Sequence, residues 1–155
     1  MAVVTISRQM GSLGNAVAEE VGRSLGYKVV WREVINAAAL RAGVPEVALA
    51  TIDELNLLGL KPSDADREAY HNAVHDIMFE IQQGGNAVIV GRAGQMILRG
   101  VEGVLHVRVF APFALRVERI AQRHGVTEDV ARNQVKTSDR SRKQYLKRYY
   151  QADVD

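Results

Sequence analysis

The sequence contains no cysteine, and it has no apolar run long enough to span a membrane. The absence of cysteine excludes disulfide bonds and thiolate metal sites. A transmembrane helix needs roughly 20 consecutive apolar residues. Nothing at the N-terminus resembles a signal peptide, because Met1 leads directly into the strand-like run Ala2 to Ile6. We therefore expect a cytoplasmic protein with no membrane partner.

Net charge is also small. A formal charge of +2 is too low to indicate bulk nucleic-acid binding, so nucleic acid is not an expected partner. The charge is unevenly distributed, however, because residues 116 to 148 contain ten of the 20 Lys and Arg residues and only four acidic residues. This basic third either binds an anionic partner or forms a solvated helical face.

The apolar residues that are present suffice for one core. A chain of 155 residues with 47% apolar residues fits a single domain over residues 1–155. Runs rich in β-branched residues predict buried strands at 2–6, 27–31, 86–90 and 104–110. Helical patterns are expected at about 16–25, 33–42, 46–60, 66–83, 113–123 and 126–150, with breaks in the last near 137–141. Gly26 is placed to end the first of these helices.

Strands that alternate with helices indicate an α/β fold with a mostly parallel sheet. Such sheets bind ligands at the carboxyl ends of their strands. A glycine-containing loop, Ser7 to Asn15, follows the first strand, and arginines stand near the ends of the others. Backbone N–H groups of such a loop can approach phosphate oxygens at the start of a helix. The alternative is that Gly11 and Gly14 only make a turn.

Several motifs resemble one known family. The segment Val4 to Gly14 reads VTISRQMGSLG, which is similar to the opening ITISRxxGSGG of the cytidylate kinase-like family, a branch of the P-loop nucleoside monophosphate kinases. The further matches fall in the order and approximate spacing of that family, and they are Leu25-Gly26-Tyr27, Arg32-Glu33, Val88 to Arg92, Ala111-Pro112, Arg116 to Arg119, and Asp139 to Arg142 with Tyr145. Together they cover nearly the whole chain.

The resemblance implies a three-layer α/β/α P-loop kinase fold with a lid-like helical region at about 112–150. It implies an ATP- and Mg²⁺-dependent phosphoryl transfer to a pyrimidine monophosphate, CMP or dCMP. Phosphates would be held by Arg8, Gly11, Ser12, Gly14, Asn15 and Ala16, and the acceptor by Arg32 and Arg92. Arg140 and Arg142 would be catalytic, Arg116 and Arg119 would belong to the lid, and no protein ligand to a metal is implied. Any one of these arginines could instead be an ordinary surface cation.

The sequence also departs from the family pattern. Leu13 replaces a glycine of GSGG, Asn15 stands where an arginine is common, and Trp31 stands where relatives often have aspartate. The chain stops at Asp155, before the last strand and helix of the family, so we expect the sheet to lack its last edge strand. A homodimer or a swapped arrangement could cover that edge.

These departures leave a second hypothesis open. The chain could be a degenerate kinase fold that binds a nucleotide or anion as a sensor, or acts as an interaction module, without turnover. A third hypothesis is nucleic-acid binding through the basic C-terminal helices, which would depend steeply on salt.

Two other groups of side chains have alternative interpretations. His71 and His75 lie four residues apart, as two metal ligands could, but without an obvious third ligand a solvated helix face is favoured. Tyr145, Tyr149 and Tyr150 could stack on bases, but their spacing near one helical turn favours packing of a helix onto the domain.

Overall fold

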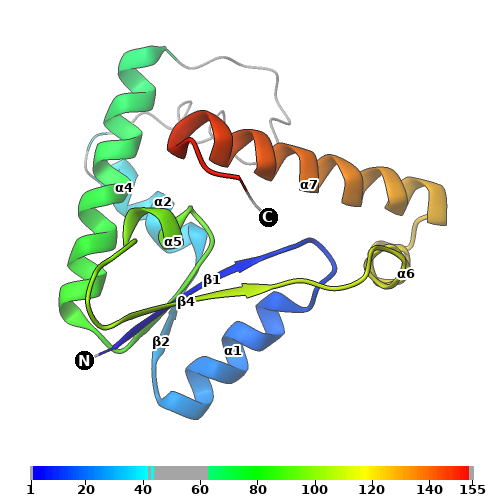
Figure 1. The fold of residues 1–155 in the computed structure, drawn as a ribbon, viewed down its shortest axis with the longest axis horizontal. Coiled ribbons are helices and arrows are strands. Elements are labelled where there is room, and N and C mark those ends of the chain that lie inside the picture. The colour runs from blue at the N-terminus through cyan, green and yellow to red at the C-terminus, as the bar shows by residue number, and fades with distance from the viewer. Residues whose placement is uncertain (1, 42, 44–62, 154–155) are drawn as a thin grey trace.

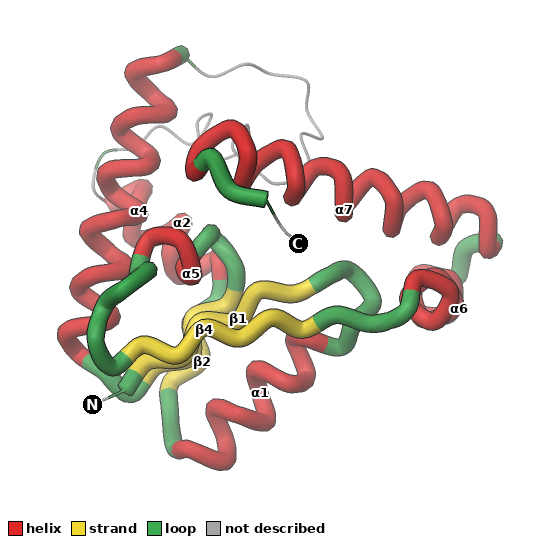
Figure 2. The backbone as a smooth tube through the Cα atoms, viewed as in Figure 1, coloured by secondary structure: helices red, strands yellow, loops and turns green. Residues whose placement is uncertain are grey.

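The computed structural model describes residues 2–41, 43 and 63–153. Its centre is a sheet of four strands in the order β2-β3-β1-β4 (Figure 2). The strands are β1 (Val3–Arg8), β2 (Lys28–Val30), β3 (Ala87–Val90) and β4 (Val104–Val109). Every pairing is parallel. The prediction of a parallel α/β sheet is confirmed.

Helices cover both faces of this sheet (Figure 1). The six described helices are α1 (Gly14–Leu25), α2 (Arg32–Arg41), α4 (Asp64–Gly84), α5 (Gly94–Ile97), α6 (Phe113–His124) and α7 (Glu128–Tyr150). In Figure 1, α1 lies on one side of the sheet, whereas α5 and α7 lie on the other. The layers are therefore α/β/α, as the resemblance implies. Among the described residues, no helix is both long and apolar enough to cross a membrane.

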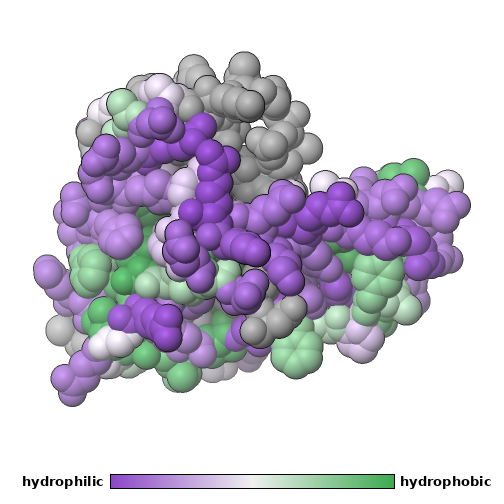
Figure 3. Space-filling model, turned by 45° about the horizontal axis from the view of Figure 1, so that its top comes forward, coloured by the Kyte–Doolittle hydropathy of each residue, from purple (hydrophilic) through white to green (hydrophobic). Residues whose placement is uncertain are grey.

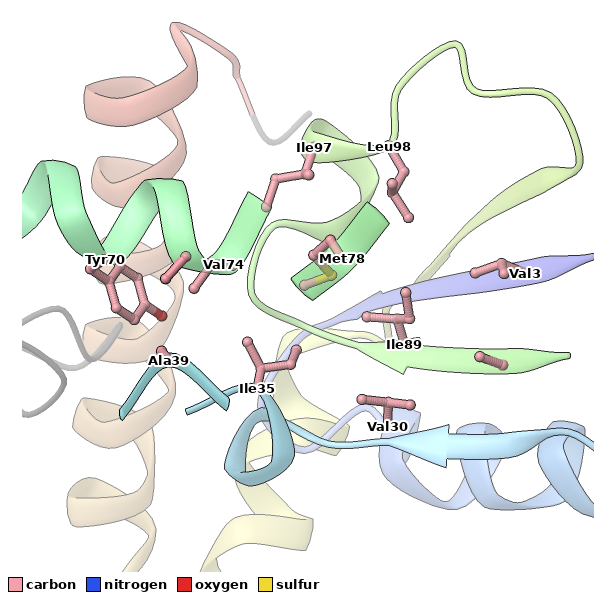
Figure 4. Packing of buried hydrophobic residues seen from close by; sticks show 12 residues of the cluster. Val3, Val30, Ile35, Ala39, Tyr70, Val74, Met78, Ile89, Ile97 and Leu98 are labelled. Carbon is pink, nitrogen blue, oxygen red and sulfur yellow. The ribbon is translucent and has the colours of Figure 1, made fainter. Parts of the chain in front are cut away.

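The alternation of side chains along the strands produces two cores. One side of the central strands packs against α1, with Val4, Ile6, Val88, Val90 and Ala18 buried together. The other side packs against α2, α4 and α5, and Figure 4 shows this larger cluster. Tyr70, Met78 and Ile89 are all nearly inaccessible to solvent there. Since burial of one such side chain contributes about 1.5–3 kcal/mol, this cluster is a large part of what stabilises the sheet against α2, α4 and α5.

Most expected elements appear, with two differences. Gly26 ends α1 with a φ of 65°, as predicted. The short helix α5 was not predicted. The expected breaks near 137–141 do not occur, because α7 is continuous from Glu128 to Tyr150. Its polar middle is held by tertiary contacts, since Ser138 is buried and Asp139 pairs with Arg116. The helix expected at 46–60 lies outside the described residues.

β4 forms one edge of the described sheet. It pairs with β1 on one side and with no described strand on the other. The sheet thus has the four-strand form that the sequence led us to expect.

Candidate functional site

The loop between β1 and α1 is tightly folded around two glycines. Gly11 has a φ of 79°, and a Cβ atom there would lie 2.7 Å from the carbonyl oxygen of Arg116. A Cβ atom on Gly14 would collide with the side chain of Arg8. The Ser12 hydroxyl donates to the carbonyl of Gln9 at 2.8 Å and accepts from the N–H of Gly14 at 3.3 Å. Close packing therefore requires both glycines, beyond any need for a simple turn.

The open side of this loop is the first turn of α1. Asn15 and Ala16 are exposed there, and backbone N–H groups in a first helical turn have no intrahelical acceptor. Arg8 reaches the same turn, because its Nε donates to Oδ1 of Asn15 at 3.0 Å. Free N–H groups, the helix dipole and a neighbouring guanidinium together suit an anion.

Leu13 occupies the position of the family glycine without filling the loop. Its φ of 67° and ψ of 14° are left-handed, a conformation that glycine adopts at little cost. Its side chain is 41% exposed. The substitution therefore strains the backbone, while the side chain is not packed into the loop.

Three arginines from the C-terminal helices bind carbonyl groups of this loop. Nη1 of Arg119 donates to the carbonyl of Gly11 at 3.1 Å. Nη1 of Arg142 donates to the carbonyl of Arg8 at 2.6 Å. Arg116 contacts the carbonyl of Met10 at 3.4 Å. The helices α6 and α7 are thus joined to the loop between β1 and α1 by side chains far away in the sequence.

Arg116 has the most constrained environment of the three. It is 3% exposed, and its two Nη atoms bond to the carboxylate of Asp139 at 3.0 and 2.8 Å. Its Nε donates to the carbonyl of Ala111 at 3.0 Å. The family resemblance implied that Arg116 and Arg119 belong to a lid over the donor phosphates. In the structure, Arg116 on α6 contacts both Asp139 on α7 and the carbonyl of Met10 in the loop, and Arg119 donates to the carbonyl of Gly11.

A pocket of about 570 Å³ opens on the α7 side of the sheet. Its lining comes from the end of β1, the turn after β3, helix α5, strand β4, helix α7 and the C-terminal segment. Seen from the side of α7, hydrophilic side chains cover most of the surface in Figure 3.

The lining of the pocket is rich in positive charge. The cationic residues that line it are Arg8, Arg108, Arg140, Arg142 and Lys143, and the acidic ones are Asp139 and Asp153. The charge of Asp139 is already paired with Arg116. Because like charges on a concave wall raise the local potential, this pocket favours an anionic ligand.

Arg92 lies beside the pocket rather than on its wall. It is 3% exposed, has a φ of 51°, and its guanidinium carbon is 5.9 Å from the ring centroid of Tyr70. Its Nε is buried without a hydrogen-bond partner among the described residues. The neighbouring Gly91 and Ala93 do line the pocket. A buried donor left unpaired is costly, which makes Arg92 a candidate for contact with a ligand.

The site thus brings together many of the residues that the sequence indicated. Arg8, Arg140 and Arg142 line the pocket, and Gly11 to Ala16 form the adjacent loop. Arg32 begins α2, but its side chain lies outside the described part of the structure.

Three further residues that line the pocket, His106, Arg108 and Lys143, were not among the site residues expected from the sequence. The alternation of His106 and Arg108 on β4 was an available signal, because residues two apart share a face.

The ring of His71 on α4 packs against the rings of Tyr145 and Tyr149 on α7. The His71 ring is 4.5 Å from that of Tyr149 and 6.5 Å from that of Tyr145, centroid to centroid. Burial, with a smaller contribution from His75, lowers the pKa of His71 below its ordinary value. The packing interpretation of the tyrosines fits, whereas His71 is not the solvated side chain that we expected. In the described ranges, no group of three potential ligands could hold a metal ion.

Comparison with known proteins agrees with this geometry. The model of the cytidylate kinase-like family matches residues 3–155. A cytidylate kinase of Pyrobaculum calidifontis is 28% identical over 156 residues, covering 100% of this chain and 78% of that protein. A cytidylate kinase of Methanocaldococcus jannaschii is 26% identical over 148 residues, covering 94% and 80%. A uronate isomerase of Corynebacterium glutamicum is 27% identical over 120 residues, and the chain spans only 23% of its length.

Solved structures support the fold. A protein from Eubacterium ventriosum, described as uncharacterized, superposes with a TM-score of 0.75 at 20% identity, covering 100% of this chain and 82% of that chain. A gluconokinase from Sinorhizobium meliloti has a TM-score of 0.53 at 19% identity, covering 88% and 74%. With the parallel sheet, the glycine loop and the converging arginines, the match over residues 3–155 shows that this chain belongs to the cytidylate kinase-like family.

Proposed function

We propose that this protein is a nucleoside monophosphate kinase that transfers a phosphoryl group from ATP, with Mg²⁺, to a pyrimidine monophosphate such as CMP or dCMP. The observation that carries the proposal is the junction of the loop and the pocket at Arg8. This residue lines the pocket, its carbonyl accepts from Arg142, and its Nε reaches Asn15 in the first turn of α1. A donor phosphate on the loop and an acceptor in the pocket would therefore be neighbours.

The loop would hold the donor. The N–H groups of Asn15 and Ala16 and the side chain of Arg8 provide donors for phosphate oxygens at the start of α1. The close packing at Gly11 and Gly14 keeps bulky side chains out of the loop interior. These residues fit a triphosphate. Mg²⁺ is commonly held largely by substrate phosphates and water. It would therefore arrive bound to ATP and would help to neutralise the negative charge of the phosphoryl group that is transferred.

The pocket would hold the acceptor. Arg140, Arg142 and Lys143 on α7 face it together with Arg108 on β4. Phosphoryl transfer requires mainly positioning and cancellation of charge. In this proposal, Arg142 bridges the two sites, Arg140 and Lys143 bind the acceptor from α7, and Arg92 contacts its phosphate.

A coupled assay of ADP release tests this function with CMP, dCMP, UMP and AMP as acceptors. We expect turnover with a pyrimidine monophosphate. Arg142→Met should lower kcat by about 10²–10³-fold, the usual effect of losing a group that stabilises charge in the transition state. Arg123→Met is the matched control, because Arg123 is exposed on α6 and does not line the pocket. Its activity should stay within twofold of the unsubstituted protein.

One observation favours the sensor alternative. Arg116 and Arg119, which the family places in the lid, bind loop carbonyls and Asp139 here. A sensor would bind ATP or CMP in isothermal titration and release no ADP with any acceptor. That pair of results would replace the kinase by the sensor, and an absence of binding to ATP, CMP and sulfate would remove both.

A further inference from the structure

His106 lines the pocket, and its ring is hydrogen-bonded to a neighbouring strand of the sheet. It lies on β4, beside Thr5 of β1 in the parallel register, and it lines the pocket. Its Nδ1 and the Oγ1 of Thr5 are 2.7 Å apart, a short hydrogen bond. The ring is thus attached to the sheet at one nitrogen.

Thr5 is a rigid support for this ring. It is 1% exposed and lies under α5, where a Cβ atom on Gly94 would be in ordinary van der Waals contact with its Cγ2, at 3.5 Å. A buried hydroxyl cannot exchange its partner for water without a large penalty. The hydrogen bond to this buried hydroxyl favours one orientation of the exposed His106 ring before any ligand arrives, and such pre-organisation lowers the entropic cost of binding.

The other ring nitrogen, Nε2, is the polar atom that remains for a ligand. It has no hydrogen-bond partner among the described residues. If Thr5 donates to Nδ1, the proton of the neutral imidazole is on Nε2. Nε2 would then be a neutral donor in a pocket whose charged donors include Arg108 and Lys143. A ligand suited to such a lining supplies oxygen acceptors.

We propose that His106 is a ligand-contacting residue of this pocket, which donates a hydrogen bond from Nε2 to an oxygen of the bound nucleotide. Thr5 is its positioning residue. The identity of the ligand as a monophosphate rests on the proposed function, whereas the contact itself depends only on the pocket. The oxygen belongs either to the phosphate or to the base and ribose, and inorganic phosphate and cytidine distinguish these sources.

The test is a titration of the full chain followed by ¹⁵N NMR of its histidine side chains. His106 is assigned by the loss of its signals in His106→Asn. CMP should shift the Nε2 signal of His106, and either inorganic phosphate or cytidine alone should reproduce the shift at higher concentration. His124 is the matched control, because its Nδ1 also makes a side-chain hydrogen bond, to Gln134 at 2.9 Å, on an exposed helix outside the pocket. Its signals should not move.

Affinity gives an independent measurement. His106→Asn should weaken binding of CMP by about tenfold or more, since a hydrogen bond to a charged ligand is lost. His124→Asn should leave the Kd unchanged. Thr5→Val, which preserves shape, should move the Nδ1 signal of His106 and weaken CMP binding less than His106→Asn does.

The possible results separate this inference from the kinase proposal. A shift of His106 with phosphate or cytidine, in a protein without turnover, would retain the contact and remove the kinase. Turnover of CMP with an unmoved His106 signal and an unchanged Kd in His106→Asn would make His106 a surface histidine only and overturn the inference. Absence of binding by all three probes would overturn it as well.

Discussion

The ion pair between Arg116 and Asp139 should be a main connection between α6, α7 and the loop that follows β1. We predict that Asp139→Asn destabilises the protein. The substitution removes the negative charge and places an amide donor against a guanidinium that is 3% exposed. Arg116 would keep the carbonyls of Ala111 and Met10, at 3.0 and 3.4 Å, and one neutral amide oxygen at position 139 in place of the carboxylate.

The magnitude follows from the burial of the two partners. Breaking a buried pair by removing one member costs roughly 3–5 kcal/mol, because the other charge stays buried. The side chain of Asp139 is 32% exposed, whereas that of Arg116 is 4% exposed, so solvent relieves part of this cost. We expect a loss of about 2–3 kcal/mol in the free energy of unfolding. For a chain of this size that corresponds to roughly 5–10 °C in Tm.

Urea denaturation at pH 7 measures this loss, with Glu128→Gln as the matched control on the same helix. Glu128 pairs with Arg132 at 2.6 Å, but both side chains are exposed, at 71% and 42%. Exposed pairs four residues apart contribute only about 0.3–0.5 kcal/mol. Asp139→Asn could instead lower the free energy of unfolding no more than Glu128→Gln does, at an unchanged m value. That result would show that the ion pair between Arg116 and Asp139 does not stabilise the protein, and it would refute the reasoning. A double-mutant cycle with Arg116→Met should show positive coupling between the two sites.

Two further predictions concern backbone strain and burial. Leu13→Gly should stabilise the protein by up to about 1 kcal/mol, because relief of left-handed backbone strain of roughly 1–2 kcal/mol exceeds the entropic cost of glycine in the unfolded chain. Urea denaturation measures the change in the free energy of unfolding. A loss of stability would show instead that the Leu13 side chain makes stabilising contacts. His71 has a pKa lowered by burial, so the unfolded chain binds its proton more readily and stability should fall as the pH drops below about 6.5. His71→Phe should reduce this fall when unfolding is compared at pH 7.5 and 5.0, and equal slopes in both proteins would contradict the assignment.

Local patterns predicted much of the fold. The β-branched runs became β1, β3 and β4, and Gly26 ended α1, because strand burial and helix termination depend on residues close together in the sequence. The glycine loop was visible for the same reason. The family motifs then indicated a candidate site at the ends of these strands.

Other features were hidden because they depend on partners far away in the chain. The polar stretch at 137–141 has a sequence that suggests a break, yet α7 is continuous there, and Asp139 within it bonds to Arg116, 23 residues earlier. The support of His106 by Thr5 joins residues 101 positions apart. Neither pairing leaves a local signature.

By itself, the sequence determined the alternation of strands and helices, the glycine loop and the excess of positive charge near the C-terminus. Each of these features depends on residues that are close together in the sequence. Only the tertiary structure decided which arginines bind loop carbonyls and which line the pocket. A guanidinium can reach several acceptors with similar local energy, and the choice among them is made by how α6 and α7 pack against the sheet.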